Sequence, residues 1–307
     1  MTMWMVFALL LAVMLVVDLG LNRKSHTISF KEALCWSMVW IGLALIFNAG
    51  IWYTMGSGKA VEFFTGYVIE KALSVDNLFV FIMIFTYFGI EGRHQARILK
   101  WGILGALVMR AIFIFAGIEL LERFTWLFPV FGALLLVTAW KMAFGGEGKI
   151  DPAQNPMVRI CGKLLPITRK IRGDWFLKRK RGILLASPLL LALVMVESSD
   201  VVFAIDSIPA IFAITLDPFI VFTSNIFAIM GLRALYFLLA NMLGMFVYLK
   251  YGISAVLAFV GGKMLATAAG FHVPTVMSLC LILLILIIAV LLSVATGKQE
   301  AEVPENQ

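Results

Sequence analysis

Charge is scarce in this chain. Only 14% of its 307 residues are Asp, Glu, Lys or Arg, whereas 62% are hydrophobic and the mean hydropathy is +0.99. A soluble domain of this size needs far more charge to cover its surface, so most of the chain is expected to lie in lipid. The sequence also lacks the alternating segments of about ten residues that a transmembrane barrel needs. The composition therefore predicts an all-α, polytopic membrane protein.

Cysteine and histidine are rare as well, with three of each. Cys35, Cys161 and Cys280 are scattered without a C-x-x-C spacing, so we expect neither a disulfide nor a thiolate metal site. The histidines lie in loops or at the ends of apolar stretches. G-x-S-x-G, H-E-x-x-H and glycine-rich phosphate-loop motifs are absent from the sequence. These absences argue against an enzyme and against an organic cofactor.

Apolar stretches of near 20 residues, the length that crosses hydrocarbon as a helix, recur along the chain. Nine spans are expected, at roughly 3–21, 33–54, 61–88, 97–120, 125–144, 183–210, 218–240, 250–269 and 273–296. The first has no basic flank or cleavage site and is expected to be retained. A polar segment at 145–181 separates the fifth and sixth spans. It begins with the linker GGEGKIDPAQNP and ends in LLPITRKIRGDWFLKRKRG, either an interfacial helix on an anionic leaflet or a solvated cytoplasmic loop.

Lysine and arginine predict the orientation. The loops on one side of the nine spans carry eighteen basic residues, and those on the other side carry two, Lys59 and Arg123. By the positive-inside rule the N-terminus lies outside and the C-terminus in the cytoplasm. The net charge of +7 is then explained by topology, and a nucleic-acid partner is not expected.

Acidic residues nevertheless occur inside two predicted spans. The candidate ligands are Glu70, Asp76 and Asn77 in the third span and Glu197, Asp200, Asp206 and Ser207 in the sixth. Each ionised residue at mid-bilayer costs about 2.5–3.5 kcal/mol, so five unpaired acids would cost roughly 12–18 kcal/mol. They must be neutralised by protons, by cations or by bases. The bases within the spans that could pair with them are chiefly Arg110, Arg233 and Lys71, and three bases do not balance five acids.

The two acidic spans begin units with a shared pattern. Glu70 precedes Asp76 by six residues, as Asp200 precedes Asp206, and an Arg-Ala pair and then a Lys-Met pair follow in each unit. Because each unit has three spans, the copies must lie in opposite orientations, as in many secondary transporters. We therefore expect an inverted repeat of spans 3–5 and 6–8. The chain then divides into residues 1–58, 59–144, 145–182 (the basic cytoplasmic loop), 183–270 and 271–307.

Helix geometry limits how these acids can meet. Residues seven apart share a helix face, so Glu70 lies above Asn77 and Asp200 above Ser207, whereas residues six apart diverge by about 120°. Convergence of all the acids would require unwinding or a kink near the aspartates. Pro209 cannot donate to the carbonyl of Ile205, which is left free beside Asp206. At Pro188 a kink is predicted, with a freed carbonyl of Leu184 as the alternative. Asp217 and Pro218 are predicted to open the seventh span as N-cap and first helical residue. Asp18 is predicted to be a helix-end residue.

The donors are carboxylate, amide, hydroxyl and carbonyl oxygens, which suit Mn²⁺, Mg²⁺ or Ca²⁺ rather than copper or zinc. Buried carboxylates also bind protons, so exchange of metal against protons is a natural coupling. The residues therefore predict a carrier of a hard divalent cation, with Arg110 and Arg233 as supporting charges.

EKALSVDNLFVF (70–81), ESSDVVFAIDSIPAIFAIT (197–215) and SNIFAIMGLRALYFLL (224–239) resemble the signatures of the TerC/Alx family of integral membrane proteins. The resemblance covers nearly the whole chain and is to bacterial Alx-type members, associated with manganese export and with alkaline or metal stress. It implies a manganese exporter of the bacterial cytoplasmic (inner) membrane. The family's acidic positions fall on Glu70, Asp76, Glu197, Asp200 and Asp206. Some relatives are linked to membrane-protein insertion, so the alternative is an assembly, scaffold or stress-resistance factor without transport activity.

Overall fold

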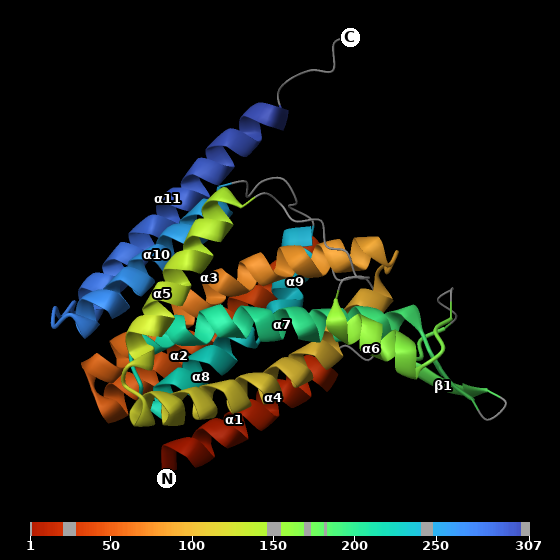
Figure 1. The fold of residues 1–307 in the computed structure, drawn as a ribbon, viewed down its shortest axis with the longest axis horizontal. Coiled ribbons are helices and arrows are strands. Elements are labelled where there is room, and N and C mark those ends of the chain that lie inside the picture. Colours follow the sequence, from red (N-terminus) through yellow and green to blue (C-terminus); the bar gives the residue numbers. More distant parts are fainter. Residues whose placement is uncertain are drawn as a thin grey trace.

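The computed structural model describes residues 2–20, 29–145, 155–168, 173–180, 183–240 and 248–301, and these parts are almost entirely helical (Figure 1). In chain order the elements are α1 (Thr2–Gly20), α2 (Phe30–Met55), α3 (Ser57–Tyr87), α4 (Arg93–Arg123), α5 (Leu127–Phe144), α6 (Pro156–Leu164), β1 (Leu177–Lys180), β2 (Ile183–Ala186), α7 (Pro188–Phe212), α8 (Pro218–Ile229), α9 (Leu232–Ala240), α10 (Leu249–Ala268) and α11 (Thr275–Ala301).

The predicted spans coincide with these helices, the seventh with the pair α8 and α9. Within the described residues, six helices are long and apolar enough to cross a membrane, or seven if the bent α8–α9 pair is one span. α1 is a shorter apolar helix. α3 is long enough but carries several charges. The polytopic helical membrane fold is thus confirmed, while the count of nine spans stays a prediction.

The helices form two groups (Figure 1). In the larger one α3 packs against α2, α7 and α8, and α4 packs against α7. Its core contains an aromatic cluster in which the rings of Phe47 and Phe227 lie 4.7 Å apart. In the second group α5 packs closely on α10, and α11 covers α10. A Cβ on Gly132 of α5 would lie 3.0 Å from the carbonyl oxygen of Gly261 of α10, so the two backbones cross almost in contact.

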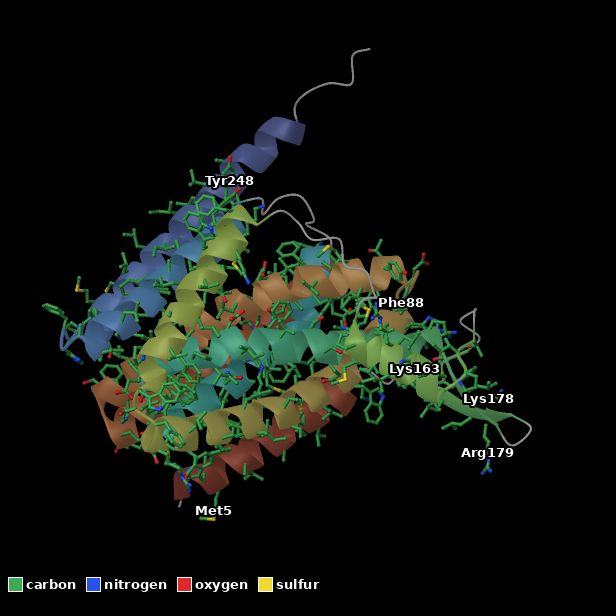
Figure 2. The ribbon with its side chains drawn as sticks, viewed as in Figure 1. Met5, Phe88, Lys163, Lys178, Arg179 and Tyr248 are labelled. Atoms are coloured by element: carbon green, nitrogen blue, oxygen red, sulfur yellow. The ribbon has the colours of Figure 1, made fainter. Side chains whose placement is uncertain are left out.

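The polar segment before α7 differs from the expectation. Leu177–Lys180 pairs antiparallel with Ile183–Ala186, so the predicted start of the sixth span is a strand, and its helix begins at Pro188. Pro188 is the first helical residue, where no donor is required, and Leu184 lies in a strand. Pro188 therefore neither kinks a helix nor frees a helical carbonyl of Leu184, and both alternatives are wrong. The hairpin lies away from the bundle, with Lys178 and Arg179 near its end (Figure 2). In the described part of 164–182, residues 164–168 and 173–180, the alternative of an interfacial helix is not found: α6 ends at Leu164, and Leu177–Lys180 is a strand.

The seventh span, rather than the acidic helices, is broken. α3 and α7 each continue as one helix through Asp76 and Asp206, so the predicted unwinding there is wrong. The break lies between α8 and α9, which meet at a 41° bend, and Gly231 adopts φ +81° there. Glycine has no Cβ and adopts this left-handed conformation without strain.

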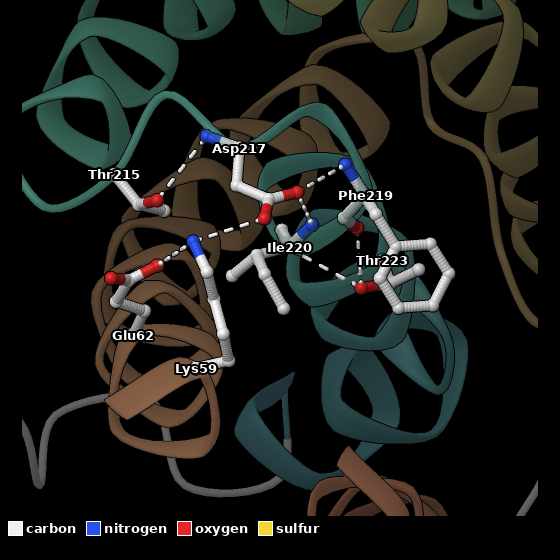
Figure 3. A network of polar contacts seen from close by, with 7 residues as sticks. All are labelled: Lys59, Glu62, Thr215, Asp217, Phe219, Ile220 and Thr223. Atoms are coloured by element: carbon white, nitrogen blue, oxygen red, sulfur yellow. Dashed lines mark hydrogen bonds and ion pairs between the residues drawn. The ribbon is translucent and has the colours of Figure 1, made fainter. Parts of the chain in front are cut away.

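α8 begins as predicted. Asp217 caps it by accepting hydrogen bonds from the backbone nitrogens of Phe219 (3.0 Å) and Ile220 (3.4 Å), and Pro218 follows as the first helical residue (Figure 3). Lys59 of α3 lies 3.0 Å from both the Asp217 and the Glu62 carboxylates, so this network joins the first turns of α3 and α8. The cap prediction is therefore confirmed.

Several predictions fall outside the described residues: most of the linker at 145–156, the basic loop at 22–28 and the tail beyond residue 301. The five-part division of the chain and the orientation in the membrane stay predictions.

Candidate buried carboxylate site

The acidic motifs present buried polar faces to the interior of the larger group. On α3, Glu70 and Asn77 are buried, and on α7 so are Asp200 and Ser207. Each pair is seven residues apart, which places both members on one helix face. Asp76 and Asp206 lie on other faces, as the geometry of a continuous helix requires.

Arg110 of α4 joins the two motifs. Its side chain is fully buried, and Nη1 donates to Glu70 Oε1 and, at 2.9 Å, to Asn225 Oδ1 of α8. Asn225 also donates through Nδ2 to Glu70 Oε2 at 3.2 Å. Arg110 Nη2 lies 3.6 Å from Asp200 Oδ1. One arginine therefore bridges Glu70 of the first motif and Asp200 of the second, within a cluster built by α3, α4, α7 and α8.

The sequence did not single out Asn225. The available signal was an amide between apolar residues of a span, in SNIFAIM, where an amide requires a buried partner.

Glu197 lies beside this cluster. Its carboxylate sits over Gly105 of α4, where a Cβ would collide with it. It is close enough to Asp200 for electrostatic repulsion. With all groups ionised, Glu70, Glu197, Asp200 and Arg110 carry a formal charge of −2.

The later acid of each six-residue pair, Asp76 or Asp206, faces the smaller helix group. Asp206 accepts a hydrogen bond from Thr138 of α5 at 2.9 Å and lies within electrostatic range of Lys141. Asp76 lies within electrostatic range of Lys250 of α10. In the part of the chain that the structure describes, no three Asp, Glu, His or Cys side chains are grouped so as to hold a metal. Convergence of all five acids on one ion is therefore not observed there.

Arg233 takes a different partner from the one expected. Its Nη2 donates to the backbone carbonyl of Asp18 at 2.7 Å and lies 3.3 Å from the Asp18 carboxylate. Asp18, predicted to be only a helix-end residue, thus ties α1 to α9 by a buried ion pair. A cavity of about 20 Å³, room for one water, lies between Asp200 and Arg233.

Lys71 is the third of the bases expected to pair with the acids. Its Nζ donates to the carbonyl oxygens of Ala228 (3.0 Å) and Met230 (3.4 Å). These carbonyls belong to the broken end of α8, where helical partners are missing. Lys71 therefore caps the break, a role that sequence spacing does not reveal because 157 residues separate the lysine from Ala228.

Several buried polar atoms of the site have no hydrogen-bond partner: Asp200 Oδ2, Arg110 Nε, Arg110 Nη2, Ser74 Oγ and Ser207 Oγ. Each such group costs about 1–3 kcal/mol unless water or a ligand satisfies it. The interface between α3 and α7 thus contains buried donors and acceptors that a polar ligand or an ion could satisfy.

The fold and this cluster define a polytopic integral membrane protein with ionisable groups in its interior. Residues 55–301 match the model of the family described as "Integral membrane protein TerC family", and the chain belongs to that family.

It is 51% identical over 263 residues, 85% of this chain and 82% of the relative, to the uncharacterized membrane protein STKORF319 of Myxococcus xanthus. It is also 45% identical to a Photorhabdus laumondii protein over 99% of this chain and 98% of that one. The same identity holds for an Escherichia coli K12 protein over 95% and 94%. Both of the latter carry the name "Putative membrane-bound redox modulator Alx". No solved structure matches the chain.

Proposed function

We propose that this protein exports Mn²⁺ across the bacterial cytoplasmic membrane in exchange for protons. The observation that carries the proposal is the buried cluster in which Glu70 of one acidic motif and Asp200 of the other share Arg110. The acids outnumber the bases near them, and each buried charge without a partner lowers the stability of the fold. A structural role alone therefore accounts poorly for these acids.

The ligand chemistry supports a hard divalent cation. The proposed ion-binding residues are Glu70, Asp76, Asn77, Glu197, Asp200, Asp206 and Ser207, and all supply oxygen. Such donors suit Mn²⁺ and also Mg²⁺ or Ca²⁺. Protonation of the same carboxylates would release the metal, so the two ions would move in opposite directions.

Contacts between α5 and α10 support an inverted repeat. Ser254 of α10 donates to the carbonyl of Ala139 of α5 at 2.6 Å, and Gly132 of α5 meets Gly261 of α10. If Lys141 is aligned with Lys263, Gly132 aligns with Ser254 and Ala139 with Gly261. When each residue is replaced by its aligned counterpart, the contact of Ser254 with Ala139 becomes the contact of Gly132 with Gly261. A twofold axis between the units requires this correspondence.

The positions of Asp76 and Asp206 agree with the same twofold relation. Asp76 of the first unit faces α10 of the second, and Asp206 of the second faces α5 of the first. Rocking of one unit against the other would therefore change the surroundings of both aspartates together. In this mechanism the ion passes along the interface of α3 and α7, past the hydroxyls of Ser74 and Ser207.

The test uses cells that make Asp76→Asn or Asp206→Asn, are loaded with Mn²⁺ and are followed for metal content. Efflux is expected to be lost while the protein level in the membrane is kept. Glu119→Gln, at an exposed ion pair with Arg123, is the matched control and should leave efflux intact. Unchanged efflux in both aspartate variants would contradict the transport site and favour an assembly or stress-resistance role, which tolerates loss of the buried acids.

A further inference from the structure

We propose that Arg110 is a tethered competitor of the transported cation: its guanidinium and the divalent ion bind the same carboxylate oxygens in alternation. This inference rests on the proposed transport function and adds a mechanism of ion release to it.

The surroundings of the guanidinium are those of a cation site. Glu70, Asn225 and Asp200 direct oxygens toward it from three different helices. Two of these ligands are carboxylates and the third is an amide carbonyl, which is the donor set that a hard divalent ion selects. An ion that used these oxygens would have to take them from Arg110.

The guanidinium is held firmly on one side and loosely on the other. Nη1 has hydrogen bonds to Glu70 and Asn225, whereas Nη2 is 3.6 Å from Asp200, too far for a good hydrogen bond. Nε and Nη2 of Arg110 and Oδ2 of Asp200 have no hydrogen-bond partner although they are buried. A purely structural ion pair is stable when such atoms are satisfied. On this loose side Asp200 Oδ2, which has no hydrogen-bond partner, is the oxygen that an incoming ion would reach first.

The charges favour this exchange. Glu70, Glu197 and Asp200 carry a formal charge of −3, which becomes −2 with Arg110 bound and −1 with a divalent ion bound in its place. The carboxylates then attract the guanidinium more weakly, and Arg110 withdraws from them. When Arg110 returns it restores a positive charge beside the ion, which weakens binding and promotes release.

Arg123 provides the matched control. It is an arginine of the same helix, α4, but it is exposed and its Nη2 lies 2.6 Å from the Glu119 carboxylate. Its removal therefore leaves the buried oxygens around Arg110 unchanged.

The experiment measures the Mn²⁺ dissociation constant of the full-length protein in detergent by calorimetric titration. Arg110→Gln is expected to bind Mn²⁺ about tenfold tighter or more than the wild type, because a unit charge near the ion is removed from a low-dielectric site. Mn²⁺ efflux from cells that make this variant is expected to be several-fold slower, because no guanidinium then displaces the bound ion. Arg123→Gln should bind with wild-type affinity.

Arg110→Lys provides a second test if Arg110→Gln does not fold. An ammonium cannot span Glu70, Asn225 and Asp200 together, so this variant should bind Mn²⁺ more tightly than the wild type while keeping the charge. Equal or weaker binding in the Arg110 variants, with a wild type that binds Mn²⁺, would overturn the competitor role alone. Absence of Mn²⁺ binding in the wild type and in every Arg110 variant would overturn the proposed function itself.

Discussion

Gly231→Ala tests the break between α8 and α9. Gly231 has φ +81°, and a Cβ there would lie 2.5 Å from Cδ1 and 2.7 Å from Cγ of Trp40. A left-handed conformation costs a residue with a Cβ about 1–2 kcal/mol. Overpacking against Trp40, which is 3% exposed, adds about 1–3 kcal/mol. The expected loss of unfolding free energy is therefore about 2–5 kcal/mol.

The assay is thermal unfolding of the purified protein in detergent, compared with Gly270→Ala. Gly270 has φ +90° but open space around its Cβ position, so the control carries the backbone strain without the collision. Gly231→Ala should be less stable than Gly270→Ala by about 1–3 kcal/mol, the packing contribution. Equal losses in the two variants would refute the close contact between the break and Trp40.

Two further substitutions test the neighbourhood of the site. Lys71→Met removes the donor to the carbonyls of Ala228 and Met230 and should destabilise the protein by about 1.5–3 kcal/mol in the same unfolding assay. Lys59→Met, at a partly exposed network, should cost about 1 kcal/mol or less, and an equal loss in both would count against capping by Lys71. Gly105→Ala should displace the Glu197 carboxylate, lowering Mn²⁺ efflux several-fold with little loss of stability. Gly262→Ala, which enters open space, should not lower efflux, and equal efflux in both would argue against a role for Glu197.

Much of the fold follows from local sequence. The helices lie where long apolar runs predict them, because in lipid a backbone satisfies its hydrogen bonds within a helix. The burial of Glu70 with Asn77, and of Asp200 with Ser207, follows from the rotation of 100° per residue. Asp217 as the cap of α8 likewise depends on neighbours in the chain.

The partners of the charged residues depend on tertiary packing and could not be predicted in this way. Arg233 pairs with Asp18, 215 residues away, and Lys71 caps a break that no proline marks. The break itself rests on Gly231, which is one of 25 glycines in the sequence. The hairpin of β1 and β2 was missed because its apolar second strand continues directly into the apolar run of α7.

Mn²⁺ flux into liposomes that contain only the purified protein tests the central claim most directly. A dye quenched by Mn²⁺ inside the vesicles would report entry down an imposed Mn²⁺ gradient, with an opposing pH gradient added in parallel samples. The wild type should carry Mn²⁺, faster with the pH gradient, and Asp200→Asn should reduce the flux to the level of protein-free vesicles. A wild type no faster than protein-free vesicles, or an Asp200→Asn variant as fast as the wild type, would contradict transport through the buried carboxylates.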